Sequence, residues 1–348
     1  GYAAPVISGL GAVATLLGLG SGPMLLVLAQ GLTLLVYRAL AARHAAAYLS
    51  VQLLGQTLAL AAAFMWWLGL PMPAVVPWFV GFLVLTIWGE RIELSRFGGP
   101  GRHAELLALW GVGLVTVAVV TTLVWPPVGF TILGVALLVV AGWLFRYDVA
   151  RRTIRATGLP RFAAVAMLAG YVWLALGGLV WIMGGPVAVP GWYDTAVHTI
   201  FLGFAMSMVM AHAPVILPAV LRLRLPYHPV LWVPLGLLHL GLAVRVGALS
   251  AGAHRFWQAG GMLTIAALVA LALGAVGLAL WAQRRAGPGP ATPESPRDHG
   301  AAASERAERT TSAAAATSAA GRGASTTFAA TERAALTIQQ ESDPVVQP

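Results

Sequence analysis

The chain has 348 residues, of which 59% are hydrophobic and only 9% are charged, and its mean hydropathy is +0.81. A soluble domain carries roughly 25% charged residues, so this composition excludes an ordinary soluble protein and predicts a polytopic membrane protein. Cysteine is absent, which excludes disulfides, thiolate metal sites, iron–sulfur clusters and covalent c-type haem attachment. The net charge of +9 lies mainly in short loops between apolar segments, so we expect no nucleic-acid binding.

Apolar segments follow one another along the first 286 residues. A helix needs about 20 residues to cross the hydrocarbon core of a bilayer, and this length predicts an all-α transmembrane helical bundle of about ten spans embedded in membrane lipid. The predicted spans are residues 3–20, 23–41, 47–69, 73–90, 104–125, 128–146, 162–184, 194–221, 229–249 and 256–283.

Arginine gathers in the connections after alternate spans. Fourteen arginines follow the second, fourth, sixth, eighth and tenth spans, whereas only Arg245 and Arg255 lie toward the opposite side. This alternation is the positive-inside pattern. We therefore expect a multi-pass protein of the bacterial inner (cytoplasmic) membrane with both termini in the cytoplasm.

The composition changes after residue 286. Residues 287–348 begin with Pro-Gly-Pro and continue as Ala, Ser and Thr runs with scattered charge and few large apolar side chains. Such a segment buries too little apolar surface to offset the entropy of ordering. The sequence thus predicts a transmembrane domain over 1–286 and a disordered cytoplasmic C-terminal tail over 287–348.

Two histidines lie on the predicted span 194–221. His198 and His212 are fourteen residues apart, which is close to four helical turns, so both imidazoles are expected to project from nearly one face, ~21 Å apart along the axis. An ionisable side chain inside hydrocarbon is costly and is by default a functional hypothesis. Pro214 follows two residues after His212 and is expected to kink the helix.

The next span carries His239. Counted from the cytoplasmic ends of their spans, His212 lies ~13 Å deep and His239 ~16 Å deep, and a short connection joins the two helices. We therefore expect both imidazoles to face each other near the midplane. Neutral imidazole is a common metal and haem ligand. The alternative for each histidine is a hydrogen-bonded interhelical residue.

Arg245 lies six residues after His239 on the same span, ~9 Å nearer the outer surface. A haem ligated at the midplane would present its propionates to such a guanidinium, which binds carboxylates through two hydrogen bonds. The alternative is an interfacial arginine that snorkels. His254, with Arg255, Tyr193 and Asp194, is expected near the same face, either as a second metal site or proton path or as polar loop ends.

Two other polar groups have less direct interpretations. Gln52 and Gln56 share a face of one span, with Gln30 on the preceding span, and they either line a polar path or join helices by hydrogen bonds. The charges around Glu90 and Arg91 fall at the cytoplasmic border, where we expect them to pair locally.

One stretch resembles a known family. The run Tyr-Asp-x3-His198-x3-Leu-Gly-Phe-x2-Ser-Met-x3-His212-Ala-Pro, followed by Leu-Leu-His239-Leu, resembles the NnrS-type membrane proteins, which contain haem and copper and are linked to nitric oxide metabolism. More distantly it resembles subunit I of haem-copper oxidases and nitric oxide reductases. The resemblance implies that His198, His212 and His239 are haem or copper ligands. The chain has no adjacent His-His pair and no His-x-His pair, so a full dinuclear oxygen-reducing centre is not expected.

These observations lead to one functional hypothesis and two alternatives. The hypothesis is an integral membrane protein that binds haem, of the b type, with copper as a second metal, and that works in electron transfer or nitric oxide metabolism with a redox partner protein or respiratory complex. His212 and His239 are the expected axial ligands, Arg245 the propionate partner, and His198 and His254 candidates for a second metal. The alternatives are a polytopic transporter or permease, whose histidines and glutamines line a pathway, and a cofactor-free assembly partner of a respiratory complex.

Overall fold

The computed structural model describes residues 2–44, 46–95, 101–186, 190–221 and 227–285. Within these ranges all regular secondary structure is helical, which confirms the predicted all-α class. The chain divides into two units, Gly1–Arg285 and Ala286–Pro348. The predicted tail, 287–348, lies outside the described residues.

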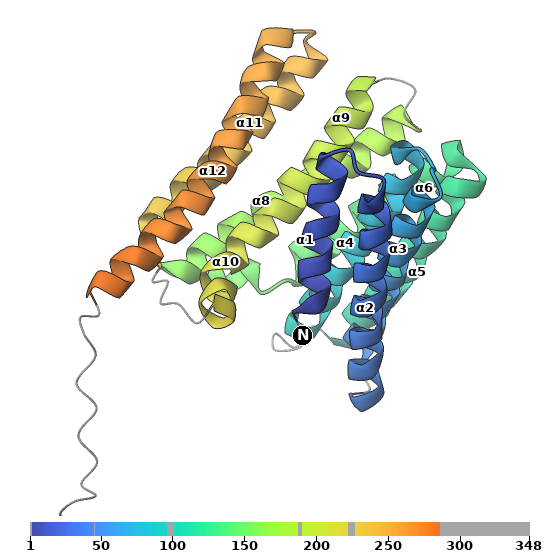
Figure 1. Ribbon diagram of the computed structural model, residues 1–348, viewed down its shortest axis with the longest axis horizontal. Helices are drawn as coiled ribbons and strands as arrows, with labels where there is room; N and C mark the ends of the chain where they lie inside the picture. The colour runs from blue at the N-terminus through green and yellow to red at the C-terminus, as the bar shows by residue number, and fades with distance from the viewer. Residues whose placement is uncertain (1, 45, 96–100, 187–189, 222–226, 286–348) are drawn as a thin grey trace, which may run out of the picture. The chain divides into compact units, whose positions relative to one another are not determined.

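The helices follow one another with short connections (Figure 1). Their bounds are α1 Ala3–Leu16, α2 Ser21–Arg43, α3 Ala47–Trp67, α4 Met72–Ser95, α5 Gly101–Val124, α6 Pro126–Tyr147, α7 Ala150–Thr153, α8 Leu159–Gly184, α9 Pro190–His198, η2 Thr199–Met206, α10 Ser207–Leu221, η3 Pro229–Leu231, α11 Trp232–Ser250 and α12 His254–Arg285.

Nine helical segments among the described residues are long and apolar enough to cross a membrane. They correspond to nine of the ten predicted spans, and they make the chain a multi-pass membrane protein. The first predicted span, 3–20, is the exception, because α1 has only 14 residues. At 1.5 Å per residue it is ~21 Å long, shorter than a hydrocarbon core of ~30 Å. Gly18, at φ 71°, ends it and turns the chain back into α2.

The predicted span 194–221 is not one regular α-helix. Residues Thr199–Met206 form a π-helix, η2, between α9 and α10. Because i→i+5 bonding places more residues in each turn, side chains beyond η2 point in other directions than an α-helix would give. The expectation that His198 and His212 share one face is therefore wrong. Pro214 and Pro218 both lie inside α10, which continues through them.

Packing between helices depends on close backbone approach at glycines. Gly134 of α6 and Gly178 of α8 face each other, and a Cβ at either position would stand 2.5–2.7 Å from the other's carbonyl oxygen. Gly241 of α11 and Gly260 of α12 meet in the same way, which lets these two helices pair side by side (Figure 1). Small residues at such crossings are typical of membrane helix packing, where close van der Waals contact supplies much of the attraction.

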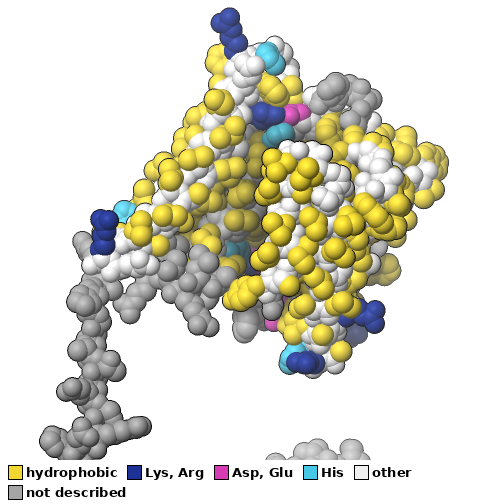
Figure 2. All heavy atoms as spheres, in the orientation of Figure 1, with side chains coloured by type: hydrophobic (Ala, Val, Ile, Leu, Met, Phe, Trp, Pro, Cys, Tyr) yellow, Lys and Arg dark blue, Asp and Glu magenta, His cyan; other side chains and the backbone are white. Residues whose placement is uncertain are grey.

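The surface agrees with a lipid environment. Figure 2 shows hydrophobic side chains covering most of the visible helix faces, with basic side chains mainly toward helix ends. Large apolar side chains such as Met262, Leu273 and Val276 of α12 are more than half exposed. Exposed apolar surface of this extent suits hydrocarbon and would be costly in water.

The glutamine pair on the early helices joins helices α2 and α3. Gln56 donates from Nε2 to both the Gln30 side-chain oxygen at 2.6 Å and the Gln30 carbonyl at 3.1 Å. Gln56 is 2% exposed. This geometry favours helix association by hydrogen bonding over the polar-path interpretation.

Candidate functional site

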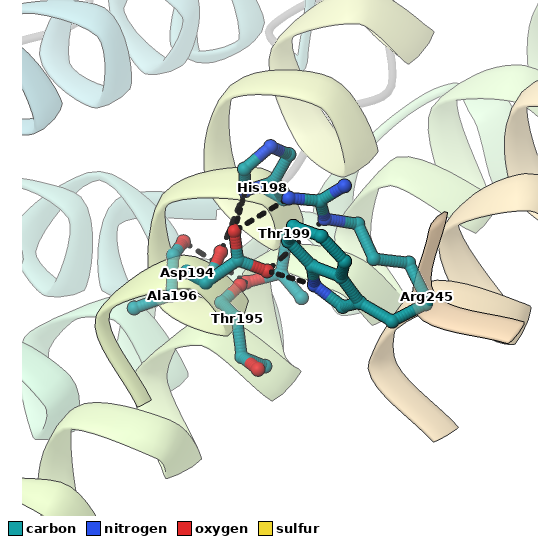
Figure 3. Close-up of polar contacts among 7 residues, drawn as sticks. Asp194, Thr195, Ala196, His198, Thr199 and Arg245 are labelled. Carbon is teal, nitrogen blue, oxygen red and sulfur yellow. Dashed lines mark hydrogen bonds and ion pairs between the residues drawn. The ribbon is translucent and has the colours of Figure 1, made fainter. Parts of the chain in front are cut away.

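A carboxylate on α9 collects donors from two other helices. Arg245 of α11 donates to Asp194 from Nε to Oδ2 at 3.0 Å and from Nη2 to Oδ1 at 2.6 Å (Figure 3). The Trp257 indole of α12 donates to Oδ2 at 3.2 Å, and the Arg245 guanidinium lies 4.3 Å from the centre of the Trp257 ring. Paired charges with further hydrogen bonds are the form in which ions persist in an apolar setting.

His198 belongs to the same cluster, one turn after Asp194. Its Nδ1 lies 2.7 Å from the Asp194 backbone oxygen and 3.4 Å from Oδ1. A carbonyl only accepts, so Nδ1 carries the proton, and the neutral ring keeps its lone pair on Nε2. No hydrogen bond from Nε2 is found among the described residues, and in Figure 3 one side of the His198 ring is joined to Asp194 by dashed lines while the other side points away from it.

His254 lies at the edge of this cluster. Its ring stacks on Trp257 with centroids 5.2 Å apart, and its Nε2 is 3.2 Å from the Gln258 side-chain nitrogen. The His254 side chain is exposed. The sequence therefore placed His254 and Asp194 in one neighbourhood correctly, with Trp257 as the residue between them.

A second cluster forms around Arg91 on α4. Arg91 is only 5% exposed. Its Nη2 donates to His212 Nε2 at 2.9 Å and its Nη1 to the Met167 sulfur at 3.3 Å. His212 Nδ1 lies 2.6 Å from the Met208 carbonyl, so this ring too has its proton on Nδ1.

Arg91 was not recognised from the sequence as a site residue. The expected local pairing is present only in weak form, since Glu90 Oε2 is 3.8 Å from Nη2 and the Glu90 side chain is 51% exposed. The partner that matters is His212, 121 residues later. The sequence interpretation ended the span at residue 90 and left Arg91 at the cytoplasmic border, whereas α4 continues to Ser95 and Arg91 is buried.

His239 has different surroundings from His212. Its Nδ1 accepts a hydrogen bond from the Trp173 indole at 2.8 Å, and the two rings are parallel within 6°. Because an indole N–H only donates, the neutral His239 ring carries its proton on Nε2, which is buried and has no partner among the described residues.

The predicted meeting of His212 and His239 is not seen among the described contacts. On α8, Met167 accepts from Arg91, the residue that donates to His212, whereas Trp173 donates to His239, and these two α8 residues are six apart, which is ~9 Å along the helix. Arg245, predicted to approach a haem propionate, has two of its nitrogens on Asp194. What the structure brings together is Asp194, His198 and Arg245 in one cluster, and Arg91 with His212 in another.

A cavity of about 670 Å³ adjoins the Asp194 cluster. Its wall is mainly apolar and includes residues of three helices: Leu176, Val180 and Met183 of α8, Trp192 and Thr195 of α9, and Leu249 of α11. This volume lies within the range of about 300–1,000 Å³ typical of ligand pockets. There is room for an apolar group beside the first turns of α9.

A metal ion and a haem make different demands on these histidines. No group of three His, Asp or Glu side chains that could hold a metal ion occurs in the described ranges. Haem needs only one axial imidazole, with its Nε2 lone pair available and Nδ1–H hydrogen-bonded. His198 meets both conditions, His212 meets them once Arg91 leaves Nε2, and His239 in its observed hydrogen bonding does not.

The fold and these clusters define a multi-pass membrane protein with ionisable side chains held inside its helical bundle. The family model described as Domain of unknown function (DUF8744) matches residues 1–280, and the chain belongs to this family. No match was found among curated proteins or among solved structures.

Proposed function

We propose that this protein is a haem-binding integral membrane protein, with copper as a second metal, that works in electron transfer or nitric oxide metabolism. One observation carries the proposal. His198 and His212 each place Nδ1 against the carbonyl oxygen four residues earlier, at 2.7 and 2.6 Å, which leaves the lone pair on Nε2. Metal-ligating histidines have this same arrangement.

The geometry changes which residues we propose as ligands. His198 is the first candidate axial ligand, because its Nε2 is free of hydrogen bonds among the described residues and Asp194 supports the ring from Nδ1. His212 is the second. His239 becomes a hydrogen-bond donor through Nε2. Arg245 remains a candidate for a propionate through Nη1, the guanidinium nitrogen that does not bind Asp194.

A bound haem would supply a one-electron couple whose potential depends on its axial ligand and its apolar surroundings. The protein's own contribution is to orient the imidazoles and exclude water. The resemblance to NnrS-type proteins supports nitric oxide metabolism as the setting. In this proposal the chain lies in the bacterial cytoplasmic membrane, has both termini in the cytoplasm, and exchanges electrons with a partner protein or respiratory complex.

An absorption spectrum of protein purified from haem-replete cells tests the proposal. We expect a sharp Soret band that is lost or shifted in His198→Ala and His212→Ala and retained in His239→Ala. Haem content per chain, measured after extraction, gives an independent readout. A colourless, folded protein, or a band insensitive to both substitutions, would contradict the proposal.

A transporter is the second candidate, and the π-helix favours it. Segments with π-type bonding occur frequently at functional sites, and η2 separates the Asp194 cluster from the Arg91 cluster along one membrane helix. Ionisable groups at both ends of such a segment suit a proton or solute path. Proton or solute flux into liposomes containing the purified protein, absent from empty liposomes, would support this function over the redox one.

A further inference from the structure

The cavity beside the Asp194 cluster reaches the lipid-facing surface of the bundle. Its volume is about 670 Å³, which is enough for one acyl chain. Two of its wall residues on α8, Leu179 and Met183, are 44% and 72% exposed. On a helix that crosses a membrane, exposed apolar side chains of this kind face hydrocarbon. A molecule that enters the cavity between them therefore comes from the lipid phase.

The cavity lies at one end of three membrane spans. Met183 is the penultimate residue of α8, and Leu249 is the penultimate residue of α11. Thr195 lies four residues inside the span Gly191–Pro218, ~6 Å from its end. The end of a span meets the border between the hydrocarbon core and the polar interface, where the ester groups of phospholipids lie. An occupant of the cavity at this depth is in contact with both regions.

A single hydroxyl belongs to the described wall of the cavity, that of Thr195. Thr199 and Thr264 donate from Oγ1 to the carbonyl four residues earlier, at 2.8 and 3.0 Å. Thr195 makes no such bond, and its hydroxyl has no partner among the described residues. Thr195 is 9% exposed, and its oxygen is not enclosed by protein, so the cavity is the space that it faces. A hydroxyl in apolar surroundings calls for an acceptor.

We propose that this cavity binds one acyl chain of a membrane phospholipid, with Thr195 Oγ1 donating to the ester carbonyl of that chain. The chain packs against the apolar walls of α8 and α11, and the head group stays in the interface. A phospholipid meets each feature of the site: it enters from the lipid, its chain is apolar, and its carbonyl is an acceptor at the depth of Thr195. The bound chain would support α9, the helix that carries Asp194 and His198.

The inference does not depend on haem, because none of the wall residues is a proposed haem ligand. The experiment uses the full chain purified in detergent and depleted of lipid by washing. Phosphatidylethanolamine is added stepwise, and native mass spectrometry counts the lipids bound to each chain. Two forms with the same head group and chain length are compared, one with ester-linked and one with ether-linked chains. A zwitterionic head group limits binding to the arginine-rich helix ends.

We expect the first ester lipid to bind the wild type more tightly than later ones do. The ether form, which lacks the carbonyl, should bind about two- to tenfold more weakly, the effect of losing one uncharged hydrogen bond. In Thr195→Val the ester and ether forms should bind equally. Thr121→Val is the matched control, since Thr121 is exposed near the end of α5 but donates to the Val117 carbonyl at 2.7 Å. It should keep the preference for the ester form.

Filling the cavity gives a second test. Leu176→Trp places an indole in the cavity and should abolish the first binding step. Val172→Trp adds the same ring to a 56% exposed position of α8 outside the described wall, and it should bind lipid as the wild type does.

Three results would overturn the proposal: a wild type without a preference for the ester form, a preference that survives in Thr195→Val, or normal binding in Leu176→Trp. Another apolar molecule that stays bound and is not displaced by phospholipid, identified by its mass, would overturn it too. If Leu176→Trp does not fold, Thr195→Val decides, because that change removes a hydroxyl at nearly constant volume. Absorption spectra report haem separately, so this proposal and the redox proposal fail independently.

Discussion

Arg245 of α11 and Asp194 of α9 lie 51 residues apart in sequence and are joined by two hydrogen bonds, of 2.6 and 3.0 Å. Their side chains are 13% and 20% exposed. Trp257 of α12 adds a third donor to the same carboxylate. Because α11 and α12 pack mainly on each other, this ion pair is a principal polar link between them and α9.

The first prediction concerns the strength of this link. Asp194→Asn leaves the Arg245 charge without its anion, and we expect the free energy of unfolding to fall by about 2–3 kcal/mol, below the value for a fully buried pair because both groups are partly exposed. Arg245→Gln should have a similar effect. The double variant should lose less than the sum of the two, since neither charge is then left alone. Thermal or denaturant unfolding in detergent measures all three.

Arg255→Gln is the control for that series, because Arg255 is an exposed arginine in the first turn of α12, close in sequence to Trp257. It should change stability by no more than about 0.5 kcal/mol. If the double variant loses as much unfolding free energy as the two single variants together, the interaction between Asp194 and Arg245 contributes nothing to stability.

The sequence was sufficient for the helices and for part of this cluster. Long apolar runs need no tertiary information to be recognised, because hydrocarbon requires every span to satisfy its own backbone. The bounds of the predicted spans alone indicated that Asp194 and His254 lie near the same side of the membrane. The ion pair itself was missed, because Arg245 had two plausible partners, a propionate or lipid-facing water, and pairing it with Asp194 requires knowing which faces of α9 and α11 meet.

The π-helix had no recognisable sequence signal. Thr199–Met206 is a mainly apolar run without proline, so the 3.6-residue period was extended through it. This error comes from accumulated rotation along a helix, which local composition does not record. Arg91 was missed for a different reason: the fourth span was ended at residue 90, whereas α4 runs to Ser95 and brings Arg91 against His212.

The second prediction concerns histidine tautomers. In protein labelled with ¹⁵N-histidine, solid-state or solution NMR should find His198 and His212 protonated on Nδ1 and His239 protonated on Nε2, because a carbonyl accepts from the first two and the Trp173 indole donates to the third. Assignment comes from single His→Gln variants. Trp173→Phe removes the indole donor, so His239 alone should change its tautomer ratio. Unchanged His239 signals in that variant would rule out the Trp173 contact.

The third prediction tests the orientation in the membrane. The chain has no cysteine, so single cysteines can be introduced without removing native ones. The positive-inside pattern predicts that His44→Cys and Arg284→Cys, at exposed arginine-rich ends, react with a membrane-impermeant maleimide only after permeabilisation. Leu68 lies between α3 and α4 and Trp125 between α5 and α6, and their side chains are 60% and 62% exposed. Cysteines at these two positions should react in intact cells. The reverse pattern would mean an inverted protein.

The fourth prediction separates two roles of His212. In His212→Ala the Arg91 guanidinium loses its nitrogen acceptor inside the bundle, and we expect a loss of about 1–3 kcal/mol in unfolding free energy. His212→Gln supplies an amide oxygen that can accept from Arg91 Nη2, so most of this stability should return. An amide does not replace imidazole as an axial ligand of haem iron. If His212 is an axial ligand, the change in the Soret band that His212→Ala causes should therefore also be seen in His212→Gln.

The combination of the two measurements decides what His212 does. His254→Gln serves as control, because it makes the same chemical change at an exposed histidine and should alter neither stability nor spectrum. If His212→Gln restores the unfolding midpoint and the wild-type spectrum together, His212 acts only as the acceptor for Arg91, and His198 remains the candidate ligand. If stability returns while the spectral change stays, the same imidazole both pairs with Arg91 and ligates the cofactor. Those two states exclude each other at Nε2, so Arg91 would then have to move for haem to bind.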